Sequence, residues 1–358
     1  MRTAIYGTIG PACTDPMVLQ KMFAAGMTGM RLNLSHVSLA GAAKEVAGIH
    51  AAAEACGKQA ELLIDMQGPE LRIGRLPEVL KLQTGGHVAF RALFSSAQTG
   101  SGEKPEQQEG DPSPGSGLLE IPVPELVLAA LRPGQDLLLD DGKLLLRVEK
   151  TGPVTARVLR GGLLSSSKSI ALPGIRLDIP AMTAADRENI RLAAACGVTA
   201  VMQPFVRSRE DLLQVRQALD EAGGQKIRLL AKIENQDGVE NLTTFFGTAD
   251  EIVIARGDLG NAMPLWQLPV LQKKISAACR AAGVPFMVVT QMLASMEHAA
   301  VPTRAEVSDI CNAVLDGAAS VMVTGETAVG AYPVETIRYL AETVRAAEDY
   351  KRAEGSAV

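Results

Sequence analysis

Eight short apolar runs, most of them separated by longer stretches with helical periodicity, constrain the fold of this 358-residue chain. Short apolar runs that end in charged or turn residues are typical of buried strands. The alanine-rich stretches between them favour helices. Regular alternation of strands and helices predicts parallel strands joined by crossover helices. The eight runs are Ala4–Ile9, Met30–Leu34, Glu61–Met66, Ala200–Phe205, Arg228–Ile233, Glu251–Ala255, Pro285–Val289 and Ser320–Val323.

The helical stretches carry start and stop signals. Asp15 followed by Pro16 is typical of a helix N-terminus. Single glycines follow five of the helices, as C-terminal caps do. Because eight strand–helix units of this size close into a cylinder, we predict an α/β fold, a (β/α)8 TIM barrel. The clearest helices are Asp15–Ala25, Ser38–Cys56, Ala184–Cys196, Ser208–Ala222, Leu268–Ala282, Arg304–Leu315 and Pro333–Glu348, and the glycines are Gly26, Gly57, Gly197, Gly283 and Gly317.

One segment after the third strand breaks the pattern. Residues 76–178 show alternating strands and no helical periodicity, which predicts a small all-β domain inserted into the barrel. The expected boundaries are 1–75 and 179–350 for the barrel, 76–178 for the insertion and 351–358 for a tail. Within the insertion, Ser95–Gly117 has almost no apolar residue, so we expect a mobile loop there. The expected strands are Gly86–Phe94, Gln135–Leu139, Leu144–Glu149 and Val154–Leu159.

The composition excludes several classes of function. A net charge of −5 and 3% aromatic residues argue against nucleic acid as a partner. No stretch approaches the length of apolar sequence that spans a membrane, so we expect no membrane partner. Five dispersed cysteines without CxxC spacing, and a start that runs directly into a strand, indicate a cytoplasmic protein with reduced thiols.

Polar side chains follow the predicted strands at their C-terminal ends, where α/β barrels place their chemistry. Glu234 and Asp258 are hard oxygen donors without a thiol or imidazole nearby, which favours Mg²⁺ or Mn²⁺. Lys232 beside them would keep the carboxylates ionised or bind a phosphate. The residues expected at this rim are Arg31, Asn33, Ser35, His36, Asp65, Arg72, Lys232, Glu234, Asp258, Thr290, Thr324 and Glu326.

Two smaller groups extend this site. Asn33, Ser35 and Asp65 supply oxygens suited to a monovalent cation. The segment Gly257–Gly260 offers backbone N–H groups to a carboxylate or phosphate. Plainer interpretations stay open. Lys232 and Glu234 can form a structural ion pair, and Asn33 and Ser35 can form a helix cap. Arg31 and Arg72 can be surface residues, His36 a loop residue, and Thr290 and Thr324 ordinary strand residues.

Nine segments of the chain together resemble the signature segments of pyruvate kinase in order and spacing. The resemblance extends over nearly the whole chain, and the inserted β domain falls where that family carries its lid domain. The segments are Thr8–Ala12 (TIGPA), Arg31–His36 (RLNLSH), Asp65–Arg72 (DMQGPELR), Asp140–Gly142 (DDG), Lys232–Asn235 (KIEN), Ala255–Gly260 (ARGDLG), Thr290–Met296 (TQMLASM), Pro302–Asp309 (PTRAEVSD) and Gly325–Pro333 (GETAVGAYP).

The resemblance implies phosphoryl transfer from phosphoenolpyruvate to ADP, giving pyruvate and ATP. It implies that Lys232 stabilises the phosphoryl group and that Thr290, with Thr324, serves protonation of the enolate. The implied catalytic residues are Lys232, Thr290, Arg31 and Thr324, and the implied substrate contacts are Arg72, Gly257, Asp258 and Thr290. The implied nucleotide contacts are Arg31, His36, Arg72 and Lys168. The implied cation ligands are Glu234 and Asp258 for Mg²⁺ and Asn33, Ser35, Asp65 and the Met66 carbonyl for K⁺.

The chain departs from the family pattern at several positions. It ends after the eighth helix, so we expect no C-terminal effector domain and no sugar-phosphate allostery, with a homo-oligomer formed through the barrel. Met66-Gln67 stand where the family usually has Thr-Lys, and Gln203-Pro204-Phe205 stand for Ala-Ser-Phe. Thr324 replaces a serine and keeps its hydroxyl.

Two other functions fit the same residues. A Mg²⁺-dependent aldolase or lyase acting on pyruvate enolate would use a similar Glu/Asp–metal pair in a barrel, although Lys232 and the inserted domain favour phosphoryl transfer. A catalytically weak regulatory protein that retained ligand binding would explain the altered residues at Met66-Gln67 and Gln203-Pro204.

Overall fold

The computed structural model describes residues 2–35, 37–93, 118–140, 142–175, 177 and 179–355. The chain divides into two compact units, a barrel unit formed by residues 1–69 with 179–358, and a β unit formed by residues 70–178. His36 and the expected mobile loop Ser95–Gly117 lie outside the described residues. No helix in the described ranges is long and apolar enough to cross a bilayer.

The barrel unit is built on eight parallel strands that close on themselves in the order β1-β16-β15-β14-β13-β12-β3-β2. Each of the eight apolar runs forms one strand, so the predicted (β/α)8 barrel is confirmed. The closure is made by β1 and β16, where Ala4 lies opposite Ser320. The strands are β1 (Ala4–Thr8), β2 (Gly29–Asn33), β3 (Glu61–Asp65), β12 (Ala200–Gln203), β13 (Arg228–Ile233), β14 (Glu251–Ala255), β15 (Phe286–Val289) and β16 (Ser320–Met322).

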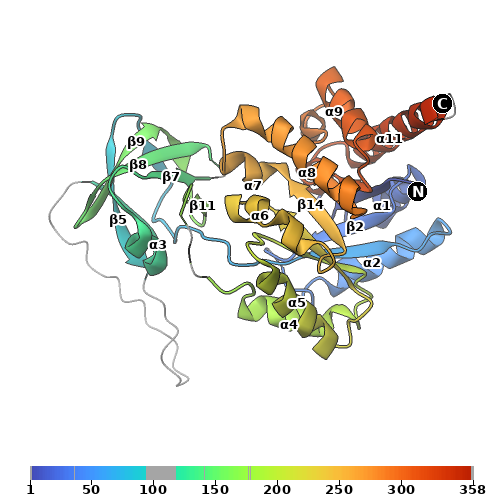
Figure 1. The fold of residues 1–358 in the computed structure, drawn as a ribbon, viewed down its shortest axis with the longest axis horizontal. Helices are drawn as coiled ribbons and strands as arrows, with labels where there is room; N and C mark the ends of the chain where they lie inside the picture. Colours follow the sequence, from blue (N-terminus) through green and yellow to red (C-terminus); the bar gives the residue numbers. More distant parts are fainter. Residues whose placement is uncertain are drawn as a thin grey trace. The chain divides into compact units, whose positions relative to one another are not determined.

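Helices lie outside the strands and bury their apolar faces against them (Figure 1). The Asp15 carboxylate caps α1 by accepting from the N–H groups of Met17 and Val18. All five glycines predicted as C-caps have positive φ, the conformation in which a side chain is strained. The long helices are α1 (Pro16–Ala24), α2 (Ala43–Ala55), α4 (Ala184–Ala193), α5 (Arg209–Glu221), α8 (Leu268–Ala282), α9 (Arg304–Leu315) and α11 (Pro333–Gly355).

Short helices occupy several loops of this unit. They are α6 (Gln236–Glu240), α7 (Arg256–Asn261) and α10 (Gly325–Ala328), with 3-10 turns η1 (Leu242–Phe245), η2 (Leu265–Gln267) and η3 (Ala294–Glu297). Helices α6, α7 and α10 begin within three residues of the ends of β13, β14 and β16. The loops that carry the rim residues are therefore short and held by regular structure.

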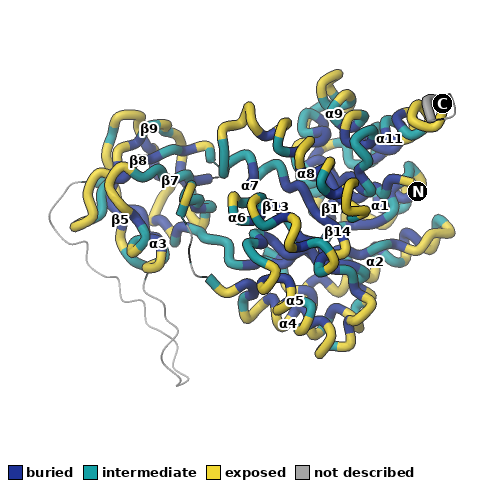
Figure 2. The backbone as a smooth tube through the Cα atoms, in the orientation of Figure 1, coloured by how far each residue is buried: buried dark blue, intermediate teal, exposed yellow. Residues whose placement is uncertain are grey.

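The barrel core has two layers. Large side chains such as Tyr6, Leu63, Met202 and Met287 fill the inside of the cylinder. A larger apolar layer lies between the strands and the surrounding helices. Figure 2 shows strands β1 and β14 buried and the outer helix faces exposed. Such packing leaves the strand ends as the places where polar side chains are accessible.

The N-terminal ends of the barrel strands carry a polar cluster of their own. The Tyr6 hydroxyl donates to Glu61 at 2.6 Å, and Arg228 bridges Glu61 and Glu251. The Ser320 hydroxyl donates to the second oxygen of Glu251. Burial raises the pKa of Glu251 above its ordinary value, although Ser320 and Arg228 oppose the shift.

The β unit has its own core and two sheets. One is six-stranded in the order β11-β7-β8-β9-β5-β6, and the other pairs β10 with β4. The unit begins at Glu70 and not at Leu76 as predicted, because Ile73 and Leu76 already pack in its core. Its elements are β4 (Leu80–Leu82), β5 (His87–Leu93), β6 (Leu119–Pro124), α3 (Glu125–Ala130), β7 (Asp136–Leu139), β8 (Leu144–Thr151), β9 (Val154–Arg160), β10 (Gly162–Leu164) and β11 (Ile170–Ala171).

The expectation that this unit has no helix was wrong, since α3 forms a single short helix after β6. Six residues are too few for helical periodicity to stand out from the surrounding strand pattern. The four expected strands correspond to β5, β7, β8 and β9.

Candidate active site

The candidate site lies where β2, β3, β13, β14, β15 and β16 end, at the C-terminal mouth of the barrel. Arg31 and Asn33 come from β2, Asp65 ends β3, and Lys232 lies near the end of β13 with Glu234 directly after that strand. Because all eight strands are parallel, these ends meet at one mouth. The polar side chains therefore converge although they are far apart in the sequence.

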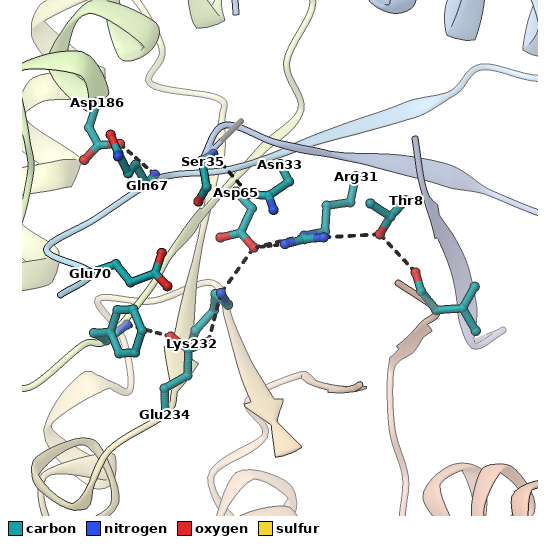
Figure 3. A network of polar contacts seen from close by, with 12 residues as sticks. Thr8, Arg31, Asn33, Ser35, Asp65, Gln67, Glu70, Asp186, Lys232 and Glu234 are labelled. Atoms are coloured by element: carbon teal, nitrogen blue, oxygen red, sulfur yellow. Dashed lines mark hydrogen bonds and ion pairs between the residues drawn. The ribbon is translucent and has the colours of Figure 1, made fainter. Parts of the chain in front are cut away.

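A continuous chain of charge-assisted contacts joins four of these residues (Figure 3). The guanidinium of Arg31 donates to Asp65 Oδ2 from Nε at 2.9 Å and from Nη2 at 2.6 Å. The Lys232 ammonium lies 3.2 Å from the same oxygen and 2.9 Å from Glu234 Oε1. One ammonium group is thus shared between carboxylates from β3 and from the end of β13.

Burial and charge set the ionisation of this group. Burial alone would lower the pKa of Lys232, but the charges of Asp65 and Glu234 outweigh it and raise the pKa above its ordinary value. Burial likewise acts to raise the pKa of Asp65, and Lys232 with Arg31 holds it below its ordinary value. The lysine therefore stays cationic and the aspartate anionic at neutral pH, as electrostatic stabilisation of an anion requires.

Glu234 is fixed from its other side by the backbone. Its Oε2 accepts from the N–H of Phe205 at 2.8 Å, and Phe205 holds a positive φ of 52°. Gln203 points away from the site, since its amide donates to the carbonyl of Asp211 on α5. The substituted segment Gln203-Pro204-Phe205 thus contributes a main-chain donor to the carboxylate and no hydroxyl.

The residues fit a hard divalent cation. A carboxylate oxygen can accept more than one hydrogen bond or metal contact. Glu234 can therefore bind a cation while it keeps its contacts with Lys232 and the N–H of Phe205. Asp258 lies in the first turn of α7, and its charge helps to raise the pKa of Lys232. Among the described residues no three His, Cys, Asp or Glu side chains gather as a metal site. Mg²⁺ needs only one or two carboxylates when substrate oxygens and water complete its shell.

A second group of oxygens fits a monovalent cation. Asp65 Oδ1 is buried, and within the described ranges no hydrogen-bond partner reaches it. Asn33 lies opposite Asp65 in the sheet register, and its side-chain oxygen accepts from the N–H of Ser35 at 3.2 Å. Figure 3 shows Asn33 and Ser35 beside Asp65. An unpaired buried carboxylate oxygen is costly unless a cation or water satisfies it.

Thr290 follows β15 in an uncommon backbone conformation. Its φ is 80°, and Gln291 after it has a φ of 55°. Such conformations cost about 1–3 kcal/mol each and recur at functional sites. A Cβ on Gly257 would lie 3.0 Å from the methyl carbon of Thr290, so a glycine lets the first turn of α7 approach this residue. Gly257, Asp258 and Thr290 therefore form one corner of the site.

Thr324 lies after β16 and is held by a buried glutamate. Its N–H donates to Glu326 Oε2 at 2.6 Å, and its hydroxyl lies 3.3 Å from the same oxygen. The other oxygen of Glu326 accepts from the N–H of Leu293, in the segment that follows Thr290. Glu326 thus links the loops that carry Thr290 and Thr324.

Three further residues were predicted from the sequence to contact substrate or nucleotide. Arg72 and Lys168 belong to the β unit. Arg72 lies 2.8 Å from the Glu70 carboxylate, and Lys168 lies 2.8 Å from Asp140. His36 is outside the described residues. The assignment of all three to substrate or nucleotide stays a prediction.

Two residues that the sequence interpretation left out hold loops of the site in place through hydrogen bonds to their backbone. Asp186 on α4 is fully buried and accepts from the N–H groups of Gln67 and Gly68 at 2.9 and 3.1 Å, which anchors the turn after Met66. Arg256 begins α7 and donates twice to the carbonyl of Thr290. The charge of Arg256 directly after an apolar strand was a usable signal. The sequence around Asp186 gave no signal of its contact with the Gln67–Gly68 turn, because Asp186 looks like an ordinary helix-capping residue.

The fold and the site define a (β/α)8-barrel enzyme whose C-terminal mouth holds a buried ammonium group between two carboxylates. Comparison with known proteins gives the family. A model of the pyruvate kinase barrel domain matches residues 1–337, and the chain belongs to the pyruvate kinase family, which consists of phosphotransferases.

Several curated proteins named pyruvate kinase are similar to this chain over nearly its whole length. The chain is 35% identical to a pyruvate kinase of Agrobacterium vitis over 98% of its own length and 70% of the relative's. It is 37% identical to one from Methylorubrum extorquens over 94% of the chain and 66% of the relative. It is 36% identical to one from Thermococcus litoralis over 99% of the chain and 71% of the relative. The resemblance predicted from the signature segments is confirmed.

Proposed function

We propose that this chain transfers the phosphoryl group of phosphoenolpyruvate to ADP, giving pyruvate and ATP. The observation that carries the proposal is the buried Lys232 ammonium, held between Asp65 and Glu234 at the barrel mouth. Phosphoryl transfer needs positioning and charge neutralisation more than covalent chemistry by the protein. A cation fixed in a largely buried site supplies both.

The first step is an in-line displacement at phosphorus. A terminal oxygen of ADP forms the new bond to phosphorus, and the bond from phosphorus to the enol oxygen breaks, leaving its electron pair on the enolate of pyruvate. Lys232 donates to the phosphoryl oxygens during transfer, and Arg31 adds a second positive charge from β2. Asp65 orients both cations through one oxygen.

The second step is protonation of the enolate. The carbon–carbon π electrons form a new C–H bond at the methylene carbon, while the enolate oxygen becomes the ketone of pyruvate. The hydroxyl of Thr290, with water held near Thr324, delivers this proton and is reprotonated from solvent. The Glu326 carboxylate supports the arrangement by fixing the backbone at both loops.

Two cations complete the proposed site. Glu234 and Asp258 would hold Mg²⁺ or Mn²⁺, and Asn33, Ser35, Asp65 and the Met66 carbonyl would hold K⁺. When bound, these ions neutralise phosphate and carboxylate charge and stabilise charge that develops during transfer. Gly257 would contribute a backbone N–H to the substrate carboxylate. Substrate and nucleotide contacts by Arg72, Lys168 and His36 are further parts of the proposal, and a homo-oligomer and a cytoplasmic location stay predictions.

The test is a coupled assay of pyruvate formation from phosphoenolpyruvate and ADP, with Mg²⁺ and with or without K⁺. Turnover should require the divalent ion, rise with K⁺, and fall by about 100-fold or more in Lys232→Met. Lys273→Met is the matched control, because Lys273 pairs with Asp316 on the outer helices and should leave turnover unchanged. Circular dichroism confirms that both variants fold.

Three results would contradict the proposal. Turnover that survives Lys232→Met would remove the assigned role of the lysine. Tight phosphoenolpyruvate binding without turnover in the unmodified protein would favour a regulatory binding protein. Cleavage of a 2-oxo-hydroxy acid in place of phosphoryl transfer would favour the aldolase or lyase.

A further inference from the structure

We infer that Arg256 and Asp309 form a positioning pair that holds Thr290 in its protonating conformation. This inference rests on the proposed function and extends it to two residues that the proposed function does not place against substrate or cation. Arg256 begins α7, Thr290 directly follows β15, and Asp309 lies on α9. The preceding residues Ala255 and Val289 are register partners in the sheet. The pair therefore links the ends of two neighbouring strands to an outer helix.

The guanidinium of Arg256 contacts the Thr290 carbonyl, the Asp309 carboxylate and the sulfur of Met292. The carbonyl oxygen of Thr290 accepts from Arg256 Nε at 3.1 Å and from Nη2 at 2.7 Å. The remaining arm, Nη1, donates to Asp309 Oδ2 at 2.5 Å. Arg256 Nη2 also lies 2.9 Å from the sulfur of Met292. All three guanidinium nitrogens of Arg256 thus donate hydrogen bonds, and the Arg256 side chain is only 12% exposed.

The backbone at this place needs such support. Thr290 is β-branched and has a φ of 80°, and the next residue is also in the left-handed region. β-Branched residues rarely adopt this conformation unless their surroundings impose it. Two hydrogen bonds to the Thr290 carbonyl fix the orientation of the peptide plane that follows the residue. A Cβ added to Gly257 would lie 3.0 Å from the Thr290 methyl carbon, so the backbone of α7 passes close to the Thr290 side chain.

Only arginine suits this role. Its planar guanidinium reaches one carbonyl with two N–H groups and a carboxylate with a third in fixed geometry. A lysine keeps the charge but presents one compact ammonium on a flexible stem, so it cannot hold both partners in the same plane. Asp309 fixes the guanidinium from the helix side. Without it, the arginine keeps its charge and its carbonyl contact but loses its orientation.

The consequence is specific to the second chemical step. If Arg256 positions the Thr290 hydroxyl, loosening it slows proton delivery to the enolate carbon more than phosphoryl transfer or substrate binding. A residue needed only for folding would instead change stability and substrate affinity without selecting one step.

The test compares Arg256→Lys and Asp309→Asn with the unmodified protein and with Asp316→Asn. Asp316 follows the same helix α9 and forms an ion pair with Lys273 away from the site, so it is a matched control. The measurements are kcat, the KM for phosphoenolpyruvate, the solvent deuterium isotope effect on kcat, and exchange of the methyl protons of pyruvate in heavy water.

We expect kcat of Arg256→Lys to fall by up to about 100-fold. A loss of this size follows when a reacting group is displaced by about 1 Å. The KM should stay nearly constant, the isotope effect should rise, and methyl-proton exchange should slow. Asp309→Asn should show the same pattern more weakly, and Asp316→Asn should match the unmodified protein. If Arg256→Lys does not fold, Asp309→Asn alone decides the question.

An unchanged isotope effect together with a raised KM would overturn the inference, because it would show general damage to the site. Unchanged kcat in both variants would overturn it as well. If the unmodified protein neither forms pyruvate nor exchanges its methyl protons, the proposed function itself fails, which the unmodified protein reveals before any variant is compared.

Discussion

Replacing Asp186 with alanine should destabilise the barrel unit far more than removal of an ordinary helix cap. Asp186 is fully buried and accepts four hydrogen bonds, from the N–H and hydroxyl of Thr183 and from the N–H groups of Gln67 and Gly68. The first two belong to the capping box of α4, and the last two tie the loop after β3 to that helix. The substitution therefore removes one half of the capping box, because Thr183 still accepts from the N–H of residue 186, and it leaves two backbone N–H groups of another loop without their acceptor.

The expected loss follows from these two parts. Loss of a whole N-cap costs about 1 kcal/mol, so loss of the Asp186 half of the capping box costs up to about 1 kcal/mol. Each backbone N–H left without an acceptor in a buried place costs at least about 1 kcal/mol more. The free energy of unfolding should thus fall by about 3 kcal/mol, a large share of the stability of a typical domain.

Asp15→Ala supplies the matched control. Asp15 caps α1 through the N–H groups of Met17 and Val18, but it is exposed, and in the part of the chain that the structure describes its carboxylate accepts from no second loop. Its removal should cost about 1 kcal/mol. The assay is urea unfolding followed by far-ultraviolet circular dichroism, in which the helices of the barrel unit dominate the signal.

Comparison of the two variants shows whether the contacts of Asp186 with the Gln67–Gly68 turn add to stability. A loss in Asp186→Ala that equals the loss in Asp15→Ala would refute the reasoning, since anchoring of the Gln67–Gly68 turn would then contribute nothing. A second readout concerns the proposed K⁺ site. Because the anchored turn follows Met66, the K⁺ concentration for half-maximal turnover should rise in Asp186→Ala and stay constant in the control.

Two further predictions concern the two ends of the barrel. Gly68→Ala should lower the melting temperature, because Gly68 has a φ of 61° and an added Cβ would lie 2.4 Å from the Pro204 ring. Pro204→Ala in the same chain should restore part of the loss, and no restoration would contradict the steric account. Glu251→Gln should flatten the fall in stability that sets in as the pH rises above the ordinary glutamate pKa of about 4.3. The folded-state pKa of Glu251 is raised, so its contribution is present at low pH and is lost as the pH rises through that value; urea unfolding at several pH values measures the slope, and an unchanged slope would contradict the assignment.

Sequence patterns predict this fold well because the barrel repeats one local rule. Each strand is a short apolar run, and each charged residue at its end, such as Lys232 or Asp65, must lie where an opposite charge or water reaches it, because burial of an unpaired charge is costly. The same rule places Glu234 and Asp258 at the same mouth. The order of the strands around the cylinder follows from right-handed crossovers.

The rest of the site depends on contacts between distant segments, which local patterns do not contain. The N–H of Phe205 donates to Glu234 from a residue with a positive φ directly after Pro204. Phenylalanine is not a residue type from which a positive φ can be predicted. Asp186 looks like any capping residue, although it also binds a loop 118 positions earlier. The short helix α3 was missed because six residues carry too little periodicity to detect. The boundary at Glu70 was missed because it depends on the packing of Ile73 in the core of the β unit, a contact that local patterns do not contain.

The pairing of β1 with β16 has a consequence for biosynthesis. Ala4 finds its partner only when Ser320 has left the ribosome, after the seven other strands of the barrel have been made. Until then β1 presents an open edge that invites pairing with other chains. Contacts this remote in sequence also form slowly, because a long loop must close before they add stability. The growing chain should therefore depend on chaperones until its final strand arrives, and stalled synthesis before residue 320 should yield aggregates instead of a smaller folded product.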